Sequence, residues 1–137
     1  MRGAAAGAVA AAAWGLSEPM LRRVAGTPYS DVRLLGRVVT PGRAWPVAGL
    51  ALHTLNGAVF GAVLARLGRR RVHEAVAIAE LEGVALWPLM LVVDRLHPDR
   101  RSGTWPPLAR NRRTFVYSLS THALFGTVYG LLSRELP

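Results

Sequence analysis

The chain has 137 residues, which is enough for one domain and too few for two ordinary soluble domains. It is 51% hydrophobic and only 18% charged, with a mean hydropathy of +0.25, whereas soluble domains carry about 25% charged residues. This composition excludes a disordered chain, and the lack of cysteine excludes disulfides, thiolate metal sites and cysteine nucleophiles. The formal net charge of +9 comes from 17 basic residues, all of them arginine, against 8 acidic residues.

Four apolar stretches cover residues 3–24, 45–67, 74–96 and 114–132. Each has about 20 residues, the length that a helix needs to cross ~30 Å of hydrocarbon. The segment from Val47 to Leu64 holds no Asp, Glu, Lys or Arg, whereas a helix of a soluble bundle has a charged face. The sequence therefore predicts an all-α fold, and it favours an integral membrane four-helix bundle. The alternative is a soluble bundle of unusually apolar helices.

The Ala-rich start of the first stretch also resembles a signal peptide. An internal repeat helps to decide whether this stretch is a signal peptide or a helix of the bundle. An offset of 69 residues aligns residues 53–61 (HTLNGAVFG) with residues 122–130 (HALFGTVYG), and it also aligns Pro19 with Pro88. We therefore predict a single membrane domain over residues 1–137, built from two tandem helical hairpins, residues 1–68 and 69–137. In this arrangement the first stretch is retained as a helix, and both hairpins enter the membrane in the same orientation.

Small residues recur at helical spacing in three of the stretches. The motif Gly-x-x-x-Gly lets helix backbones approach closely in a membrane, where no hydrophobic effect drives association. It occurs at Gly3 and Gly7, at Gly57 and Gly61, and at Gly126 and Gly130. We expect these stripes to pack the bundle internally, although a homodimer uses the same motif. Pro19 and Pro88 are expected to kink their helices at matched depth.

The connections differ in character. Residues 27–30 offer an N-cap for a short amphipathic helix over Asp31–Val39, which we expect to lie in the membrane interface. Residues 68–71 predict a tight turn between the halves. Residues 97–113 carry three prolines and predict an extended surface loop, with Trp105 as an interfacial anchor.

The distribution of arginine predicts the topology. The two long connections hold eleven arginines, and the termini and middle turn hold the other six. Membrane proteins keep an excess of basic residues on the cytoplasmic side, so we expect the long connections there. The eleven are Arg22, Arg23, Arg33, Arg37, Arg43, Arg95, Arg100, Arg101, Arg110, Arg112 and Arg113, and the six are Arg2, Arg66, Arg69, Arg70, Arg71 and Arg134.

Ionisable side chains inside the stretches are the candidate functional groups, because such groups are costly in a membrane. Depth along the helices predicts that Glu18, His53 and His122 meet in one polar layer. Glu80 and Glu82 enter from the other side, and we expect them to pair with arginines near the surface. The polar layer is interpreted either as a site that holds a proton or a metal ion, or as hydrogen bonding that ties helices together, with Asn56 as one partner.

Trp87 takes the place of Glu18 in the second repeat, and a tryptophan beside a carboxylate is able to line a cation pocket. The histidines lack the spacing of a metalloprotease motif, so we predict no metal and no cofactor. The arginine clusters lack interleaved aromatic residues, so we expect no nucleic-acid partner.

Three hypotheses for function follow. The first is a non-enzymatic, multi-pass protein of the cell membrane with a structural or partner-binding role, surrounded by lipid and paired with a second copy or another membrane protein. The second is a small proton-linked transporter or permease that uses Glu18, His53 and His122. The third is a membrane enzyme that binds a metal or haem. A cavity that reaches the polar layer favours the second hypothesis, and a packed interior favours the first.

Overall fold

The computed structural model describes residues 2–69 and 71–134, and all of its regular elements in that part of the chain are helices. Arg70, in the predicted middle turn, and residues 135–137, at the end of the predicted second repeat, lie outside the described residues. Four long helical runs correspond to the four apolar stretches: α1 (Arg2–Ala25), α3 (Trp45–Arg66), α4 (Val72–Leu86) continued by α5 (Met90–Leu96), and α7 (Arg112–Arg134). The all-α prediction is thus confirmed.

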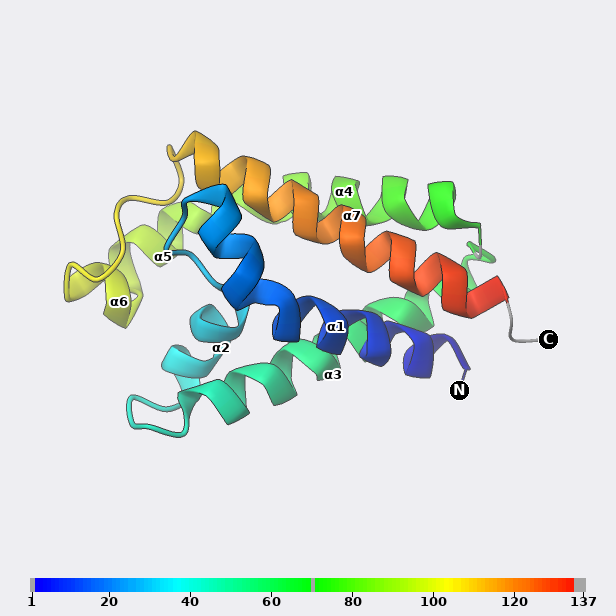
Figure 1. The fold of residues 1–137 in the computed structure, drawn as a ribbon, viewed down its shortest axis with the longest axis horizontal. Coiled ribbons are helices and arrows are strands. Elements are labelled where there is room, and N and C mark those ends of the chain that lie inside the picture. The colour runs from blue at the N-terminus through cyan, green and yellow to red at the C-terminus, as the bar shows by residue number, and fades with distance from the viewer. Residues whose placement is uncertain (1, 70, 135–137) are drawn as a thin grey trace.

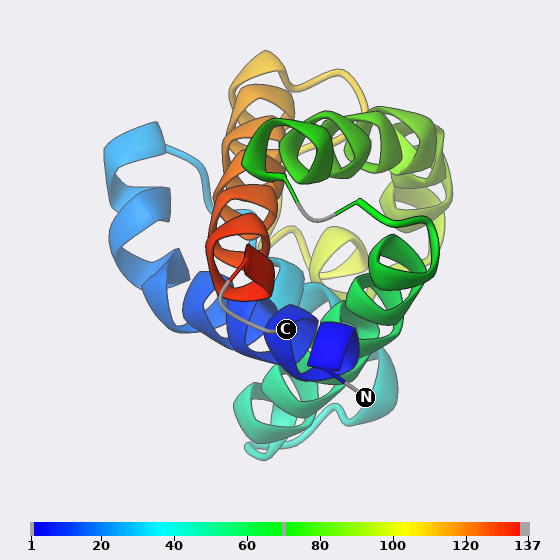
Figure 2. The ribbon, with the colours of Figure 1, turned by 90° about the vertical axis from the view of Figure 1, so that its right-hand side faces the viewer.

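The long helices surround a common interior when the molecule is viewed end-on (Figure 2). Helix α1 packs on α3 and on α7, and α7 packs on α4, whereas α3 and α4 make little contact within the described residues. The two long connections lie at one end of the molecule, and the start of α1 and the turn between α3 and α4 lie at the other (Figure 1). The bundle is therefore least tightly closed between α3 and α4.

Glycines set the distance between neighbouring helices. A Cβ added to Gly3 would lie 2.7 Å from the carbonyl oxygen of Gly61, and a Cβ added to Gly61 would lie 2.7 Å from the Cα of Gly7. Gly57 faces Gly7 in the same way. On the other side of the bundle, a Cβ on Gly126 or Gly130 would lie 2.6 Å from the Cα of a valine of α4, Val76 or Val72 respectively. Larger side chains at these glycines would force the helices apart.

The two prolines act differently on their helices. At Pro88 the α-helical hydrogen bonding gives way to a short 3-10 segment, η1 (Trp87–Leu89), between α4 and α5. Pro19 lies inside α1, which continues past it to Ala25 and changes direction in its C-terminal part (Figure 1). Proline removes one backbone donor and crowds the preceding turn, which accounts for both distortions.

The first long connection contains the expected short helix, α2 (Asp31–Val39), and the hydroxyl of Ser30 caps it by accepting the N–H of Arg33 at 3.0 Å. Helix α2 packs on the start of α3, where a Cβ on Gly36 would lie 2.9 Å from the carbonyl carbon of Trp45. The first residue of the middle turn, Gly68, has a positive φ. Only glycine adopts that conformation without strain, so the sequence marks the end of α3.

The second long connection differs from the prediction of an extended surface loop. It contains a short helix, α6 (Pro98–Arg101), and it folds inward, so that Trp105 is 1% exposed and Leu108 is fully buried. Trp105 packs with Tyr29 and Tyr117 in a second hydrophobic cluster beneath the connections. Its prediction as an interfacial anchor was wrong, because tertiary contacts with the first connection bury the indole.

By length and apolar composition, two helical runs in the described part of the chain are able to cross a membrane: Trp45–Arg66 and Val72–Leu96. The sequence predicted four such segments. Helices α1 and α7 have the required length, but glycine and the polar and charged residues of α1, and the hydroxyl residues of α7, lower their hydropathy.

Candidate functional site

A cavity of about 300 Å³ lies between the two halves of the bundle. Side chains from α1, α2, α3, α4, α5 and α7 line it, most of them apolar or aromatic. Asn56 of α3 and Leu86 of α4 line it and are themselves exposed, so the cavity reaches the outside where α3 and α4 stand apart. Its volume is at the lower end of the range of pockets that hold small molecules, ~300–1,000 Å³.

Four of the five predicted polar-site residues line this cavity: His53, Asn56, Trp87 and His122. Glu18 does not belong to the lining. Asp31 and Glu82, which the sequence analysis did not assign to the site, do.

Trp14 stands between the two histidines. Its indole ring makes edge contacts with His53, at 4.6 Å between ring centroids, and with His122, at 5.0 Å. Trp14 and His53 are each 5% exposed, and neither the indole Nε1 nor the imidazole Nε2 has a hydrogen-bond partner within the described residues. The repeat predicts that the two histidines lie at the same depth. In the structure both of them contact the same aromatic side chain, Trp14.

His122 forms the best-defined polar pair of the cavity. Its Nε2 lies 3.0 Å from a carboxylate oxygen of Glu82, and its Nδ1 lies 2.7 Å from the carbonyl oxygen of Ser118. Glu82 was expected to pair with an arginine near the surface, and this was wrong. The approach of α4 to α7 is close at Gly83, where a Cβ would lie 3.0 Å from the imidazole, and it brings Glu82 to the histidine instead.

Glu18 serves a different element. Its carboxylate accepts the backbone N–H of Asp31 at 2.7 Å, the more distant N–H of Val32 and the hydroxyl of Ser30. These donors form the N-terminus of α2, where unpaired N–H groups and the helix dipole favour a negative charge. The carboxylate thus fixes α2 against α1, and no hydrogen bond in the described structure joins it to either histidine.

Trp87 is held in the cavity wall by its own hydrogen bond. Its indole N–H donates to the carbonyl of Ala109 at 3.1 Å, and its ring makes an edge contact with Phe115. The aromatic face is therefore fixed relative to α7.

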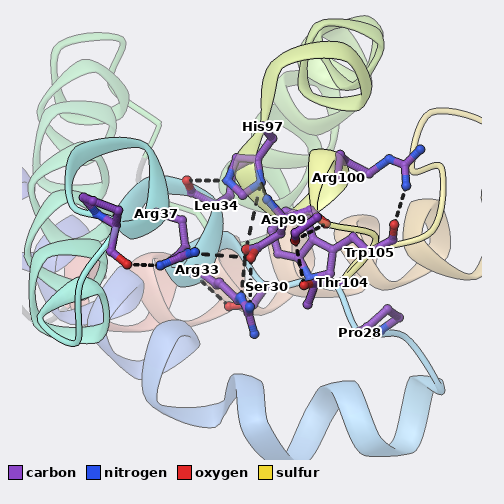
Figure 3. A network of polar contacts seen from close by, with 12 residues as sticks. Pro28, Ser30, Arg33, Leu34, Arg37, His97, Asp99, Arg100, Thr104 and Trp105 are labelled. Atoms are coloured by element: carbon purple, nitrogen blue, oxygen red, sulfur yellow. Dashed lines mark hydrogen bonds and ion pairs between the residues drawn. The ribbon is translucent and has the colours of Figure 1, made fainter.

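A second polar cluster joins the two long connections (Figure 3). Asp99, only 1% exposed, receives two hydrogen bonds of 2.8 Å from the guanidinium of Arg33, and Arg37 lies 3.6 Å away. Burial opposes ionisation of Asp99, but the hydrogen bonds and charge of Arg33, together with the charge of Arg37, outweigh it and lower the carboxyl pKa. This ion pair links α2 of the first half to α6 of the second.

His97 completes this cluster as a neutral imidazole. The backbone N–H of Asp99 donates to its Nδ1 at 3.2 Å, so its proton lies on Nε2, which donates to the carbonyl of Leu34 at 3.2 Å. The ring stacks on Trp105 with 4.6 Å between centroids (Figure 3). Burial is the main cause that lowers the pKa of His97. The sequence suggests that His97 and Asp99 belong to an interfacial charge cluster, but it does not pair them with Arg33, because nothing in the local pattern joins residues 66 positions apart.

Within residues 2–69 and 71–134, no group of three His, Asp or Glu side chains is arranged to hold a metal ion. Comparison with family models, with curated proteins and with solved structures found no match for the chain. The proposals below therefore depend on the geometry alone.

Proposed function

We propose that the chain is a non-enzymatic, multi-pass membrane protein that binds a small, largely apolar molecule in its central cavity and passes it across the membrane. The observation that carries this proposal is the cavity of about 300 Å³ between the hairpins, which reaches both histidines. A purely structural or partner-binding role would suit a packed interior better.

The outward faces of the helices support the placement in a membrane. Only 28% of the most apolar window of α3, and 17% of that of the run Val72–Leu96, is buried in the protein. A core helix of a soluble protein would instead be mostly buried. Large apolar side chains point outward on α1 and α7 as well, such as Leu16 at 70% exposed and Val116 at 52%. Soluble monomers rarely expose so many large apolar side chains, and lipid is the environment in which such an apolar outer surface is stable.

Buried polar groups support the same placement for α1 and α7. Helix α7 buries Thr114, Ser118, Thr121 and Ser133, and α1 buries Glu18. Thr121 donates its hydroxyl back to the carbonyl of Ser118 at 2.8 Å, a satisfied arrangement within the helix. Apolar side chains outside and polar side chains inside are the distribution expected of helices in a lipid bilayer.

Equivalent contacts support the two-hairpin repeat. Gly61 meets Gly3 in the first half, and 69 residues further on Gly130 meets Val72. Gly57 meets Gly7, and correspondingly Gly126 meets Val76. The two histidines also occupy equivalent places. His53 contacts Trp14, and His122 contacts Gly83, the residue 69 positions after Trp14. Each hairpin therefore uses the same positions to pack its two helices.

A binding experiment on the purified chain in detergent micelles tests the cavity. The probe is para-fluoroneopentylbenzene, an uncharged aromatic compound, observed by fluorine NMR. We expect saturable binding of one molecule per chain. Asn56→Trp fills the mouth of the cavity and should abolish binding, whereas Leu55→Trp, at an exposed neighbour that does not line the cavity, should leave binding unchanged.

Two outcomes would contradict the proposal. One is the absence of saturable binding by the native chain, both of this compound and of a cation of the same shape. The other is equal binding by Asn56→Trp and Leu55→Trp, since the probe would then lie on the outer surface or in the micelle.

A further inference from the structure

The cavity is lined by acidic side chains and by no arginine within the described residues. Asp31 and Glu82 contribute the carboxylates. One oxygen of Asp31 accepts the hydroxyl of Tyr29 at 2.7 Å, and the other is buried without a hydrogen-bond partner among the described residues. The arginines of the described residues thus all lie outside the lining of this cavity.

Hydrogen-bond chemistry fixes the number of protons on the pair of His122 and Glu82. The carbonyl of Ser118 only accepts, so the Nδ1 of His122 must carry a hydrogen. The 3.0 Å contact between Nε2 and Glu82 then needs one further proton, on either the imidazole or the carboxyl group. In both forms the pair is neutral. Without that proton, two lone pairs face each other and the pair carries a charge of minus one.

Aromatic side chains line the same cavity as the pair. Trp14 contacts the ring of His122, and Tyr29, Phe60 and Trp87 belong to the same lining. Aromatic rings attract a cation through their negative faces, most strongly where water is excluded. An apolar wall with carboxylates and ring faces suits an organic ammonium ion better than a metal ion, for which no three ligands are arranged in the described structure.

We propose that the cavity takes a small organic cation, a substituted ammonium ion, in exchange for the proton shared by His122 and Glu82. This inference rests on the proposed function and names its substrate class. When the cation binds, the shared proton leaves to solvent, so that Glu82 is a carboxylate beside the ammonium group and His122 is neutral with its hydrogen on Nδ1. One positive charge enters the site and one leaves, so the net charge of the site is the same in both states.

The other ionisable groups in or near the cavity come from three further elements. Asp31 of α2 lines the cavity and interacts electrostatically with His122, and His53 of α3 lines it on the far side of Trp14. Glu18 of α1 lies next to Asp31, whose backbone N–H it accepts. Two of these three are carboxylic acids, and carboxylates nearby strengthen the binding of a cation.

The exchange is tested with para-fluorobenzyltrimethylammonium, a permanent cation with the same shape as para-fluoroneopentylbenzene. Binding to the full chain in micelles is followed by fluorine NMR, and proton release is followed with an indicator dye in weakly buffered solution. We expect release of about one proton per cation bound, and an affinity that falls about tenfold for each unit by which the pH is lowered below the range of exchange. The uncharged compound should release no proton.

Matched variants assign the exchange to Glu82. Glu82→Gln should weaken cation binding by about tenfold or more and abolish proton release, because the amide neither ionises nor balances the ammonium charge. Glu80→Gln, two residues earlier on α4 and outside the cavity lining, should leave both unchanged. If Glu82→Gln fails to fold, the comparison of the two compounds on the native chain still decides.

Three results would overturn the exchange. They are cation binding without proton release, cation binding by Glu82→Gln at native affinity, and binding of the uncharged compound in preference to the cation. In the last case the cavity still binds an apolar molecule and the proposed function stands. If neither compound binds, the proposed function falls together with the exchange.

Discussion

At the scale of single residues, Asp99 is the side chain on which the connection end of the molecule depends most. It is almost fully buried, and its carboxylate is the acceptor for the paired hydrogen bonds of Arg33. Planar, paired hydrogen bonds between arginine and a carboxylate are among the stronger polar contacts in proteins.

We therefore expect Asp99→Asn to lower the free energy of unfolding by about 1–3 kcal/mol, since it leaves Arg33 without its counter-charge. The measurement is unfolding in detergent followed by tryptophan fluorescence. Arg43→Gln, at an exposed position of the first long connection, serves as the control and should change stability by less than about 0.5 kcal/mol. Equal stabilities for the two variants would contradict a role for the ion pair.

His97 gives the same cluster a pH dependence. Its pKa is lowered in the folded chain, so below about pH 6.5 the unfolded state binds a proton that the folded state does not. Stability should therefore fall as the pH is lowered from 6.5 through the folded pKa. The lowered pKa of Asp99 adds a further loss only below about pH 4, where the unfolded carboxyl group becomes protonated.

His97→Asn tests this sign. Asparagine keeps an acceptor for the N–H of Asp99 at the start of α6 but does not titrate. We expect thermal unfolding midpoints of the variant to vary less between pH 7 and pH 5 than those of the native chain. An unchanged slope would assign the pH dependence to other groups.

At the scale of elements, helix pairs are held by close backbone approach. Gly57 and Gly7 bring α3 and α1 together, and the side chain of Ala11 already fills the space beside Gly57. We expect Gly57→Val to destabilise the chain by about 1–3 kcal/mol or more through overpacking. Ala51→Val, at an exposed position of the same helix, should have little effect, and thermal unfolding in detergent compares the two. Comparable losses would mean that valine acts through helix propensity and not through packing.

Helix α2 depends on a carboxylate from another element. Glu18→Gln keeps the shape of the side chain but removes its charge from the N-terminus of α2. We expect a loss of about 0.5–2 kcal/mol in stability and less than a twofold change in cation binding and proton release, because Glu18 lies outside the cavity lining. Loss of proton release in this variant would mean that Glu18 takes part in the exchange, in agreement with the polar layer that the sequence predicts.

At the scale of the whole molecule, the arrangement of the ends makes the topology testable. The two long connections share one end of the molecule (Figure 1), and together with the helix ends that flank them they hold eleven of the 17 arginines. We expect both to face the cytoplasm. Because the chain has no cysteine, the single variants Gly42→Cys, Ser102→Cys and Arg71→Cys report their sides without background.

An impermeant maleimide applied to intact cells should label Arg71→Cys only, and labelling of inside-out vesicles should reach Gly42→Cys and Ser102→Cys. Labelling of Gly42→Cys and Ser102→Cys from opposite sides would contradict the parallel hairpins. Labelling of all three from outside in intact cells would contradict the membrane placement.

The sequence by itself determined the helices. Long apolar runs, prolines and glycines are local signals, and they gave the bounds of α1, α3 and α7 to within two residues, the break at Pro88 and the whole of α2. They also placed His53, His122, Asn56 and Trp87 near one another, because equivalent positions of a repeat lie at the same depth in the bundle. Local signals suffice for these features, since backbone hydrogen bonds within a helix join residues four positions apart.

Tertiary structure alone decided which polar groups meet. Glu82 pairs with His122, Glu18 caps α2, and Asp99 holds Arg33 across 66 positions of sequence. Each of these carboxylates had an arginine or a histidine nearer in sequence, and the partner depended on how two helices were rotated about their axes. That rotation is set by glycines in contact and by the burial of Trp105, quantities that arise only when the whole bundle packs.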